Sequence, residues 1–385
     1  MTIEPFRIAV PDAVLADLRE RLARTRFPDQ IEGAAWDYGT ELSYLKELVA
    51  YWRDRFDWRK QEALLNSFPQ FTARVHDHRL HFLHVRSPHA DAFPLVVTHG
   101  WPGSIFEFHK ILGPLTDPTK FGGDARDAFH VVCPSIPGYG FSEAPRTRGW
   151  DARKMAEVNA ALMAQLGYAK YGAQGGDWGA IISVQNALVD TAHCAGIHLN
   201  MVIAFPAGGM GPEALAGVTP EEQKDLADLG AFQANETGYQ QIQGTKPQTL
   251  GYGLNDSPAG LAAWIVEKFR TWSDCGGDVE KRFTKDELLT NVMLYWVTNS
   301  ITSSTRLYYE TMKSGRFGPS TERVEQPTGG AIFPKELYRA PRAWAEKSFN
   351  IQHWTRMPSG GHFAALEEPE RLAADVRSFF RLVRG

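Results

Sequence analysis

The sequence predicts an α/β fold in which a mostly parallel sheet carries helices on both faces. Two short apolar segments, 95–98 and 129–133, run directly into turns rich in glycine and proline. Continuous apolar runs of this kind are typical of strands buried on both faces of a parallel sheet. A helical segment at 155–166 is then followed by a strand signal at 171–174. This alternation of strand and helix places ligand sites at the carboxyl ends of the strands.

The composition is typical of a soluble globular protein. At 385 residues, the chain can form one large core with insertions or two modest domains. Apolar residues make up 43% of the chain, and the formal net charge of −4 gives no reason to expect nucleic acid or an anionic membrane as partner. The aromatic share of 12% is compatible with an apolar ligand pocket, and equally with a large aromatic core.

Three cysteines, Cys133, Cys194 and Cys275, are too few and too scattered to predict a disulfide framework or a zinc site. The first five residues do not form a basic segment that leads into an apolar run. No segment reaches the roughly 18 consecutive apolar residues that a membrane span needs. We therefore expect a cytoplasmic protein without a membrane anchor, and a homo-oligomer is compatible with the sequence.

Residues 1–92 are predicted to form a region that precedes the core. An amphipathic helix follows Pro11, a second helical stretch lies around 45–52, and a hairpin is expected over 71–84. The hairpin contains histidines that suggest a metal site, at positions 76, 78, 81 and 84. Because alternating strand positions point to opposite faces, we favour a solvated hairpin instead.

The rest of the chain divides into three parts. Residues 93–205 are predicted to form the first part of the core, and 326–385 the second part. Between them, 206–325 interrupts the strand and helix rhythm with helical pieces such as 261–269 and 285–298. This insertion carries many large apolar residues, so it is predicted to form a helical lid. The second part of the core shows two strand signals and a closing helix, at 331–333, 349–354 and 368–383.

The most informative motif is Gly175-Gly176-Asp177-Trp178-Gly179. The pattern of glycine, any residue, nucleophile, any residue and glycine marks a sharp turn that lifts one side chain above an α/β-hydrolase sheet. A serine that attacked a saturated carbon would form an ether, which water does not readily cleave. A carboxylate would form an ester, which water opens at its carbonyl. The aspartate therefore predicts displacement at the saturated carbon of an epoxide or alkyl halide, followed by ester hydrolysis.

Together, several segments resemble the epoxide hydrolases of the α/β-hydrolase superfamily, and more narrowly their microsomal-type branch. The matching segments are 99–104, 175–179 and 360–367 in the core, and 237–239, 254–258, 295–296 and 306–308 in the lid. The resemblance covers nearly the whole chain. It implies an α/β-hydrolase fold with an N-terminal meander and a helical lid, and an enzyme that needs neither cofactor nor metal.

The resemblance also implies a nucleophile, a base and an acid. Asp177 would be the nucleophile, although an aspartate at this place can also simply cap the following helix. His362 would be the general base that activates water against the ester. Glu336 would orient the histidine, with Glu310 and Glu325 as rival acids.

Two backbone N–H groups, those of Trp101 and Trp178, would form the oxyanion hole that stabilises charge when water attacks the ester. The resemblance implies that the bond between Trp101 and Pro102 is cis, which a position before proline permits. We expect His99 to support this loop and to take no part in the chemistry.

Epoxide opening also needs an acid for the departing oxygen. Tyr239 and Tyr308 match the pair of lid tyrosines that protonate this oxygen in the family that the sequence resembles. Tyr309 is a rival of Tyr308, and the spacing to neighbouring motif residues favours Tyr308. Ordinary packing of the lid is the alternative role for both tyrosines.

The predicted function is therefore the hydrolysis of an apolar or aromatic epoxide to a vicinal diol through an ester on Asp177. Haloalkane dehalogenases are the nearest alternative, since Trp178 is placed to hold a halide. A halide leaves without a proton, so that reaction needs no pair of tyrosines. A non-catalytic protein that binds an apolar ligand is a second alternative, although every expected catalytic position is filled. Roles in detoxification and in a biosynthetic pathway both remain open.

Overall fold

The computed structural model describes residues 2–206, 208–209, 211–315 and 322–384. Among these residues, one sheet has the strand order β1-β2-β3-β5-β4-β6-β7-β8-β9. Neighbouring strands are parallel from β5 through to β9, whereas β1, β2 and β3 join one another and β5 in antiparallel pairs. The strands are β1 (Ile3–Phe6), β2 (Gln70–Val75), β3 (His78–Val85), β4 (Phe93–Thr98), β5 (Phe129–Pro134), β6 (Tyr171–Gly175), β7 (Cys194–Leu199), β8 (Val324–Ile332) and β9 (Phe349–Arg356). The prediction of a mostly parallel sheet is confirmed.

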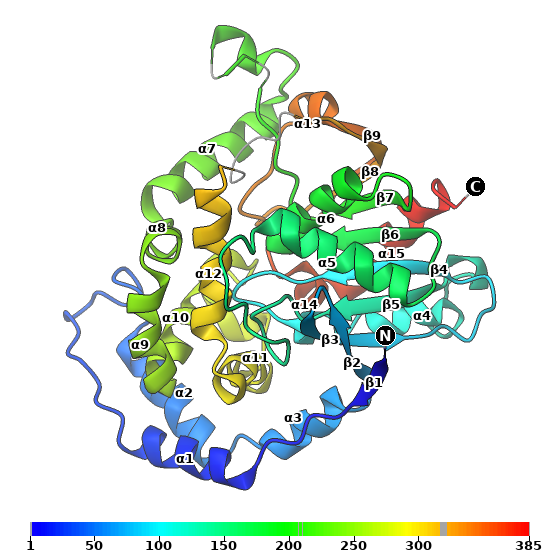
Figure 1. Ribbon diagram of the computed structural model, residues 1–385. Helices are drawn as coiled ribbons and strands as arrows, with labels where there is room; N and C mark the ends of the chain where they lie inside the picture. Colours follow the sequence, from blue (N-terminus) through cyan, green and yellow to red (C-terminus); the bar gives the residue numbers. More distant parts are fainter. Residues whose placement is uncertain (1, 207, 210, 316–321, 385) are drawn as a thin grey trace.

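The sheet is buried on both faces, which explains the continuous apolar runs. In β4, Leu95 and Val97 belong to one apolar cluster while Val96 belongs to the other. Helices of the core lie on both sides of the sheet (Figure 1). The helices of the core are α4 (Leu112–Thr116), α5 (Ala152–Gln165), α6 (Trp178–Val189), α13 (Arg342–Ser348), α14 (Ala364–Glu367) and α15 (Pro369–Arg381). Of these, α5 packs against α6, and α15 packs against both α4 and α14.

The described residues between β7 and β8 form a group of α-helices that gather beside the sheet, on the left of the view in Figure 1. They are α7 (Pro220–Asn235), α8 (Gly238–Thr245), α9 (Pro247–Asp256), α10 (Pro258–Trp272), α11 (Lys285–Thr298) and α12 (Ile301–Lys313). We refer to this group of helices as the lid. Two side chains of α11 bind the loop after β4: Asn291 donates to the carbonyl oxygen of Pro102 at 2.7 Å, and the Tyr295 hydroxyl donates to that of Gly103 at 2.5 Å. The lid is therefore fixed to the carboxyl end of a central strand.

The N-terminal region joins the other two parts of the molecule. Its helices are α1 (Asp12–Ala23), α2 (Leu42–Asp54) and α3 (Trp58–Leu65). Both α1 and α2 pack against α10, and Arg21 of α1 pairs with Asp256 at 2.7 Å. The strands β1, β2 and β3 of the same region belong to the main sheet. Short 3₁₀ helices complete the secondary structure: η1 (Ile105–Phe108), η2 (Pro118–Phe121), η3 (Ala125–Asp127), η4 (Pro212–Leu215) and η5 (Val279–Lys281).

The prediction of a solvated histidine hairpin is wrong. His78, His81 and His84 are all buried, because β3 lies between β2 and β5 inside the sheet. The ring nitrogens of His81 lie 2.9 Å from the hydroxyl of Ser135 and 2.9 Å from the amide oxygen of Gln70. Within the described ranges, no group of three histidine, cysteine or acidic side chains is arranged to hold a metal ion.

Candidate active site

Asp177 lies at a strained turn between β6 and α6, with a φ of 50° and a ψ of −130°. The glycines on either side allow the close packing that this turn requires. A Cβ on Gly179 would lie 1.8 Å from the carbonyl oxygen of Thr98, and one on Gly175 would lie 2.2 Å from the backbone of Gly179. The Asp177 side chain makes no capping hydrogen bond to α6, so helix capping does not explain this aspartate.

The Asp177 carboxylate faces both the loop after β4 and a histidine. Its Oδ1 accepts a hydrogen bond from the backbone N–H of Trp101 at 2.7 Å. Its Oδ2 lies 3.3 Å from Nε2 of His362. The bond between Trp101 and Pro102 is cis, as the resemblance implies. Gly100 lets the loop approach this closely, since a Cβ there would lie 2.2 Å from Oδ1 of Asp177.

Of the three candidate acids, Glu336 is the one that contacts the histidine. Its Oε1 lies 2.6 Å from Nδ1 of His362 and accepts a hydrogen bond from the backbone N–H of Leu337 at 2.6 Å. Glu310 instead accepts from the backbone N–H of Gly149, and the side chain of Glu325 is 74% exposed. The structure thus brings Asp177, His362 and Glu336 together in one line of contacts.

Two opposing effects set the pKa of His362. Burial alone would lower this pKa, because a charged imidazolium loses its hydration. The negative charge of Glu336, together with hydrogen bonds to Asp177 and Glu336, outweighs burial and raises the pKa of His362 well above its usual value. The imidazole therefore gains much of its basicity from the two carboxylates on either side of it.

His99 packs behind this loop with both ring nitrogens occupied. Its Nδ1 lies 3.0 Å from the carbonyl oxygen of Gly100, and its Nε2 accepts from the backbone N–H of Ile136 at 3.2 Å. Burial lowers the pKa of His99 to about 4, so the ring stays neutral at ordinary pH. These contacts fit the supporting role that we expect for His99.

The turn that carries Asp177 is referred to below as the elbow. Tyr239 of α8 and Tyr308 of α12 meet beside it, with their ring centroids 5.9 Å apart. The ring of Trp101 stacks on Tyr239 at 5.3 Å, and that of Trp178 contacts Tyr308 edge to face at 4.7 Å. Burial and the negative charge of Asp177 raise the pKa of both phenols, so each hydroxyl keeps its proton. The rival Tyr309 lies instead beneath Lys313, whose Nζ is 5.7 Å from the ring centroid.

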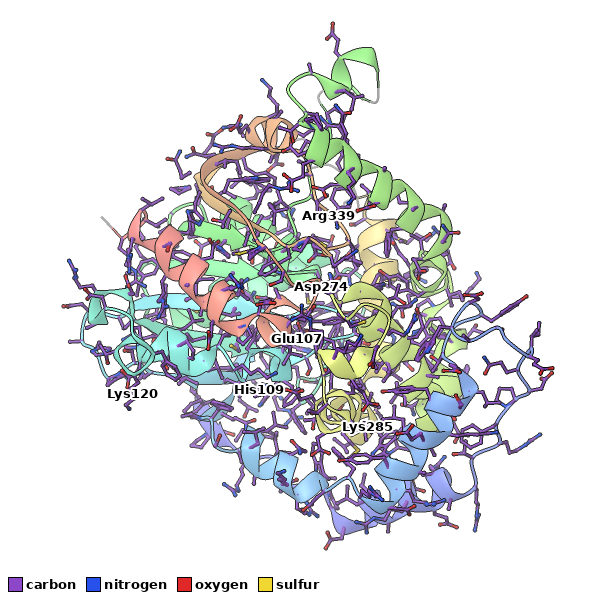
Figure 2. All side chains as sticks on the ribbon, turned by 180° about the vertical axis from the view of Figure 1, so that it is seen from behind. Glu107, His109, Lys120, Asp274, Lys285 and Arg339 are labelled. Atoms are coloured by element: carbon purple, nitrogen blue, oxygen red, sulfur yellow. The ribbon has the colours of Figure 1, made fainter. Side chains whose placement is uncertain are left out.

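A small cavity of about 20 Å³ is lined by Asp177, His362 and Glu107, among other residues. This volume fits about one water molecule. Figure 2 shows Glu107 near the centre of the view, where the core and the lid meet. None of the sequence motifs includes Glu107. The sequence does contain a signal for this residue, because a single acidic residue stands among the apolar residues of the 3₁₀ helix η1, directly after the motif at 99–104.

Burial and the negative charge of Asp177 raise the pKa of Glu107 to about 8, against the effect of nearby His362. A raised pKa means that the folded chain holds this proton more tightly than the unfolded chain does. We therefore expect Glu107 to reduce the free energy of unfolding progressively as the pH rises from about 4.5 to about 8, with no further loss above that range.

Urea unfolding of the wild type and of Glu107→Gln across this pH range measures the effect. The difference between the two proteins isolates Glu107, because all other groups titrate in both. The variant should gain stability relative to the wild type as the pH rises through this window. A constant difference across the whole range would contradict the raised pKa.

The sheet, the elbow and the aligned aspartate, histidine and glutamate define an α/β hydrolase. A family model described as the alpha/beta hydrolase fold matches residues 94–277, and one described as the epoxide hydrolase N terminus matches residues 3–108. Epoxide hydrolase 1 of Oryctolagus cuniculus is 40% identical over 406 residues, which cover 99% of this chain and 89% of the rabbit protein.

Solved structures of epoxide hydrolases match over the full length of the chain. The juvenile hormone epoxide hydrolase of Bombyx mori has a TM-score of 0.91 at 33% identity, covering 100% of this chain and 95% of the silkworm chain. The epoxide hydrolase of Aspergillus niger has a TM-score of 0.88 at 32% identity, covering 100% of this chain and 97% of the fungal chain. The chain belongs to the epoxide hydrolase family, and its reaction is the hydrolysis of an epoxide.

In the parts of the chain that the structure describes, no helix combines the length and the apolar character needed to cross a membrane.

Proposed function

We propose that this epoxide hydrolase works through an ester on Asp177, and that His362 and Glu336 activate the water that cleaves it. The proposal rests on the arrangement of the Asp177 carboxylate. One of its oxygens is 2.7 Å from the backbone nitrogen of Trp101, and the other is 3.3 Å from Nε2 of His362. A nucleophile with a base beside it, and an acid behind the base, is the arrangement that covalent hydrolysis requires.

In the first step, Oδ2 of Asp177 attacks one carbon of the epoxide ring. The bond between that carbon and the ring oxygen breaks, and the oxygen takes the electron pair. Tyr239 and Tyr308 donate hydrogen bonds and a proton to this oxygen, which makes it a better leaving group. Both phenols keep their protons because burial raises their pKa, so both are available as donors.

In the second step, water attacks Cγ of the ester while Nε2 of His362 accepts a proton from it. The cavity beside Asp177, His362 and Glu107 has room for about one water and lies next to this carbon. Charge that develops on Oδ1 is stabilised by the N–H of Trp101, and we assign the N–H of Trp178 as the second donor. The bond from Cγ to Oδ2 then breaks, and the departing alkoxide takes the proton that His362 accepted. The second proton of the water returns to the phenolate left by the first step, which restores both the tyrosine and the Asp177 carboxylate.

We propose an apolar or aromatic epoxide as the substrate. The two phenols lie among large apolar rings, since Trp101 stacks on Tyr239 and Trp272 lies 5.0 Å from it. Such surroundings favour an apolar substituent on the ring that is opened. A panel of terminal, styrene-like and bulky epoxides, with analysis of the diols formed, would test this assignment. Equal rates with small hydrophilic epoxides would contradict it.

Replacing either lid tyrosine tests the assignment of the acids. Tyr239→Phe and Tyr308→Phe should each slow ester formation by roughly 10- to 100-fold, because one of two proton donors is lost while the other remains. Hydrolysis of the ester should change little. Stopped-flow tryptophan fluorescence with an excess of enzyme resolves the two steps.

Tyr309→Phe is the matched control, since it removes a neighbouring hydroxyl on the same helix. It should react like the wild type. If Tyr309→Phe were as slow as Tyr308→Phe, the choice between these adjacent tyrosines would be wrong.

A further inference from the structure

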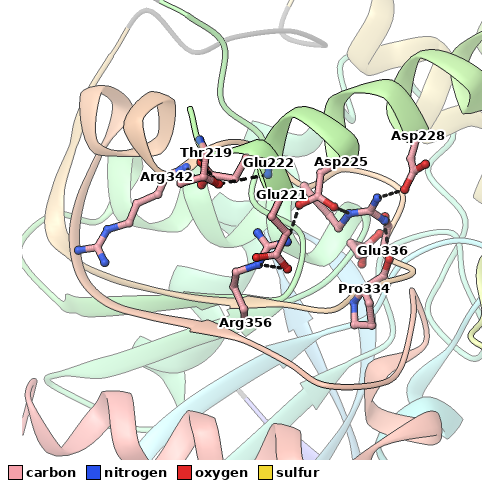
Figure 3. Close-up of polar contacts among 10 residues, drawn as sticks. Thr219, Glu221, Glu222, Asp225, Asp228, Pro334, Glu336, Arg342 and Arg356 are labelled. Atoms are coloured by element: carbon pink, nitrogen blue, oxygen red, sulfur yellow. Dashed lines mark hydrogen bonds and ion pairs between the residues drawn. The ribbon is translucent and has the colours of Figure 1, made fainter. Parts of the chain in front are cut away.

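The turn that carries Glu336 is held by a buried guanidinium three residues further along the chain. Arg339 is only 6% exposed, and its Nη1 donates to the carbonyl oxygens of Pro334 at 2.8 Å and Glu336 at 2.7 Å. On its other side, Nε donates to Asp225 at 2.9 Å and Nη2 donates to Asp228 at 2.7 Å. Both aspartates belong to α7 of the lid (Figure 3).

The position of the Glu336 carboxylate depends on this turn. Its Oε1 carries the contacts with His362 and with the N–H of Leu337, while its Oε2 is buried and finds no donor among the described residues. Hydrogen-bond partners therefore fix the carboxylate at one oxygen only. The remaining constraint comes from the backbone of the turn, which Arg339 holds at two carbonyl groups.

The same turn is joined to the loop of the base. The backbone N–H of Lys335 donates to the carbonyl oxygen of Gly360 at 3.1 Å, two residues before His362. We call the turn that carries Glu336 the acid turn. A shift of this turn would therefore alter both partners of the contact between Nδ1 of His362 and Oε1 of Glu336. A planar guanidinium that binds four oxygens restricts such a shift, whereas a single ammonium group does not reach the same set.

We propose that Arg339 is a positioning residue which couples the docking of lid helix α7 to the orientation of Glu336. This inference rests on the proposed function, because it concerns the step in which His362 activates water. When α7 is seated, Asp225 and Asp228 hold the guanidinium against the acid turn. Loss of this link leaves Asp177 and the tyrosines untouched, so ester formation persists while ester hydrolysis slows.

Arg356 supplies a matched control in the same cluster. Its Nη2 donates to Asp225 at 2.7 Å and its Nε pairs with Glu221 at 3.0 Å, so it also binds α7 (Figure 3). Among the described residues, the polar contacts of the Arg356 side chain are with α7 and not with the turn that carries Glu336. Removing Arg356 thus weakens the attachment of α7 without removing the link to Glu336.

The test compares Arg339→Gln and Arg356→Gln in single-turnover reactions that resolve ester formation from ester hydrolysis. Arg339→Gln should slow hydrolysis by roughly 10- to 100-fold, the loss that follows from a displacement of about 1 Å, with ester formation within about twofold of the wild type. The pKa that governs hydrolysis should also move down, because Glu336 then raises the pKa of His362 less. Arg356→Gln should match the wild type in both steps.

A double-mutant cycle with Glu336→Gln separates positioning from general damage. If Arg339 acts through Glu336, then Arg339→Gln should have little further effect on hydrolysis in the Glu336→Gln background. Additive losses in the two backgrounds would overturn the inference. Equal losses for Arg339→Gln and Arg356→Gln would also overturn it.

Asp228→Asn gives a milder variant in case Arg339→Gln does not fold, since the Asp228 side chain is 52% exposed. It should slow hydrolysis by about two- to fivefold and leave ester formation unchanged, because it removes the negative charge from one of the four acceptors that hold Arg339. An unchanged hydrolysis rate in this variant would count against the coupling. If the wild type itself formed no ester on Asp177, the proposed function would fail, whereas a normal ester in the wild type confines any failure to Arg339.

Discussion

Replacing Asp177 with serine is expected to abolish epoxide turnover, with kcat/KM lowered by about 10⁴-fold or more. Serine occupies the equivalent elbow in many hydrolases, so the strained turn tolerates this residue. Its hydroxyl, however, would form an ether with the opened epoxide, and water activated by His362 has no carbonyl carbon to attack in an ether. The variant should therefore form no diol under steady-state conditions.

Chiral chromatography of the diol measures this loss, and thermal unfolding shows whether the variant is folded. The melting temperature should stay close to that of the wild type, because Asp177 makes few contacts outside the site. Diol formation within tenfold of the wild-type rate, by a folded Asp177→Ser protein, would remove Asp177 from the role of nucleophile.

Replacing His362 with glutamine is expected to stop the reaction after its first step. Asp177 and both tyrosines remain, so the epoxide should still be opened. Without the imidazole, no base takes the proton from water, and turnover should fall by about 10³- to 10⁴-fold. The protein should then accumulate as the ester, with the mass of one epoxide added.

Intact-protein mass spectrometry after brief mixing measures the accumulated ester, and peptide mapping locates it. His193→Gln is a matched control, since the His193 side chain is more than half exposed and its Nδ1 lies 2.5 Å from Asp190. His193 has no part in the proposed mechanism. That variant should turn over normally and show no added mass. An unmodified His362→Gln protein, given a substrate that the wild type consumes, would argue against a two-step mechanism.

Most of the central sheet could be predicted because its strands are buried on both faces. Residues 95–98 and 129–133 read directly as strands and fall within β4 and β5. The beginning of β8 could not be predicted, since Pro327, Gly329 and Gly330 carry no strand signal. The reason is packing: a Cβ on Gly330 would lie 2.8 Å from the ring of Trp354, so an adjacent side chain fills the space that an apolar residue would otherwise occupy.

The buried histidines of β3 escaped prediction because polarity alone does not show whether a side chain finds partners in the interior. His84, for example, is buried but lies 2.8 Å from the hydroxyl of Tyr168, which is 84 residues away in sequence. The same limit applies to the site. Motifs identified Asp177 and His362, and Glu107 stands in an apolar segment directly after the motif at 99–104. Arg339, in contrast, depends on contacts between distant segments that no local pattern contains.

The proposed mechanism depends on a covalent ester on Asp177, and a single turnover in heavy-oxygen water reveals whether that ester forms. Enzyme in excess over epoxide is mixed in labelled water, and both the diol and the peptide containing Asp177 are analysed by mass spectrometry. The diol of this first turnover should carry an unlabelled oxygen from the carboxylate, and Asp177 should gain one labelled oxygen. A first-turnover diol that carries the solvent label, with Asp177 unlabelled, would contradict the covalent mechanism.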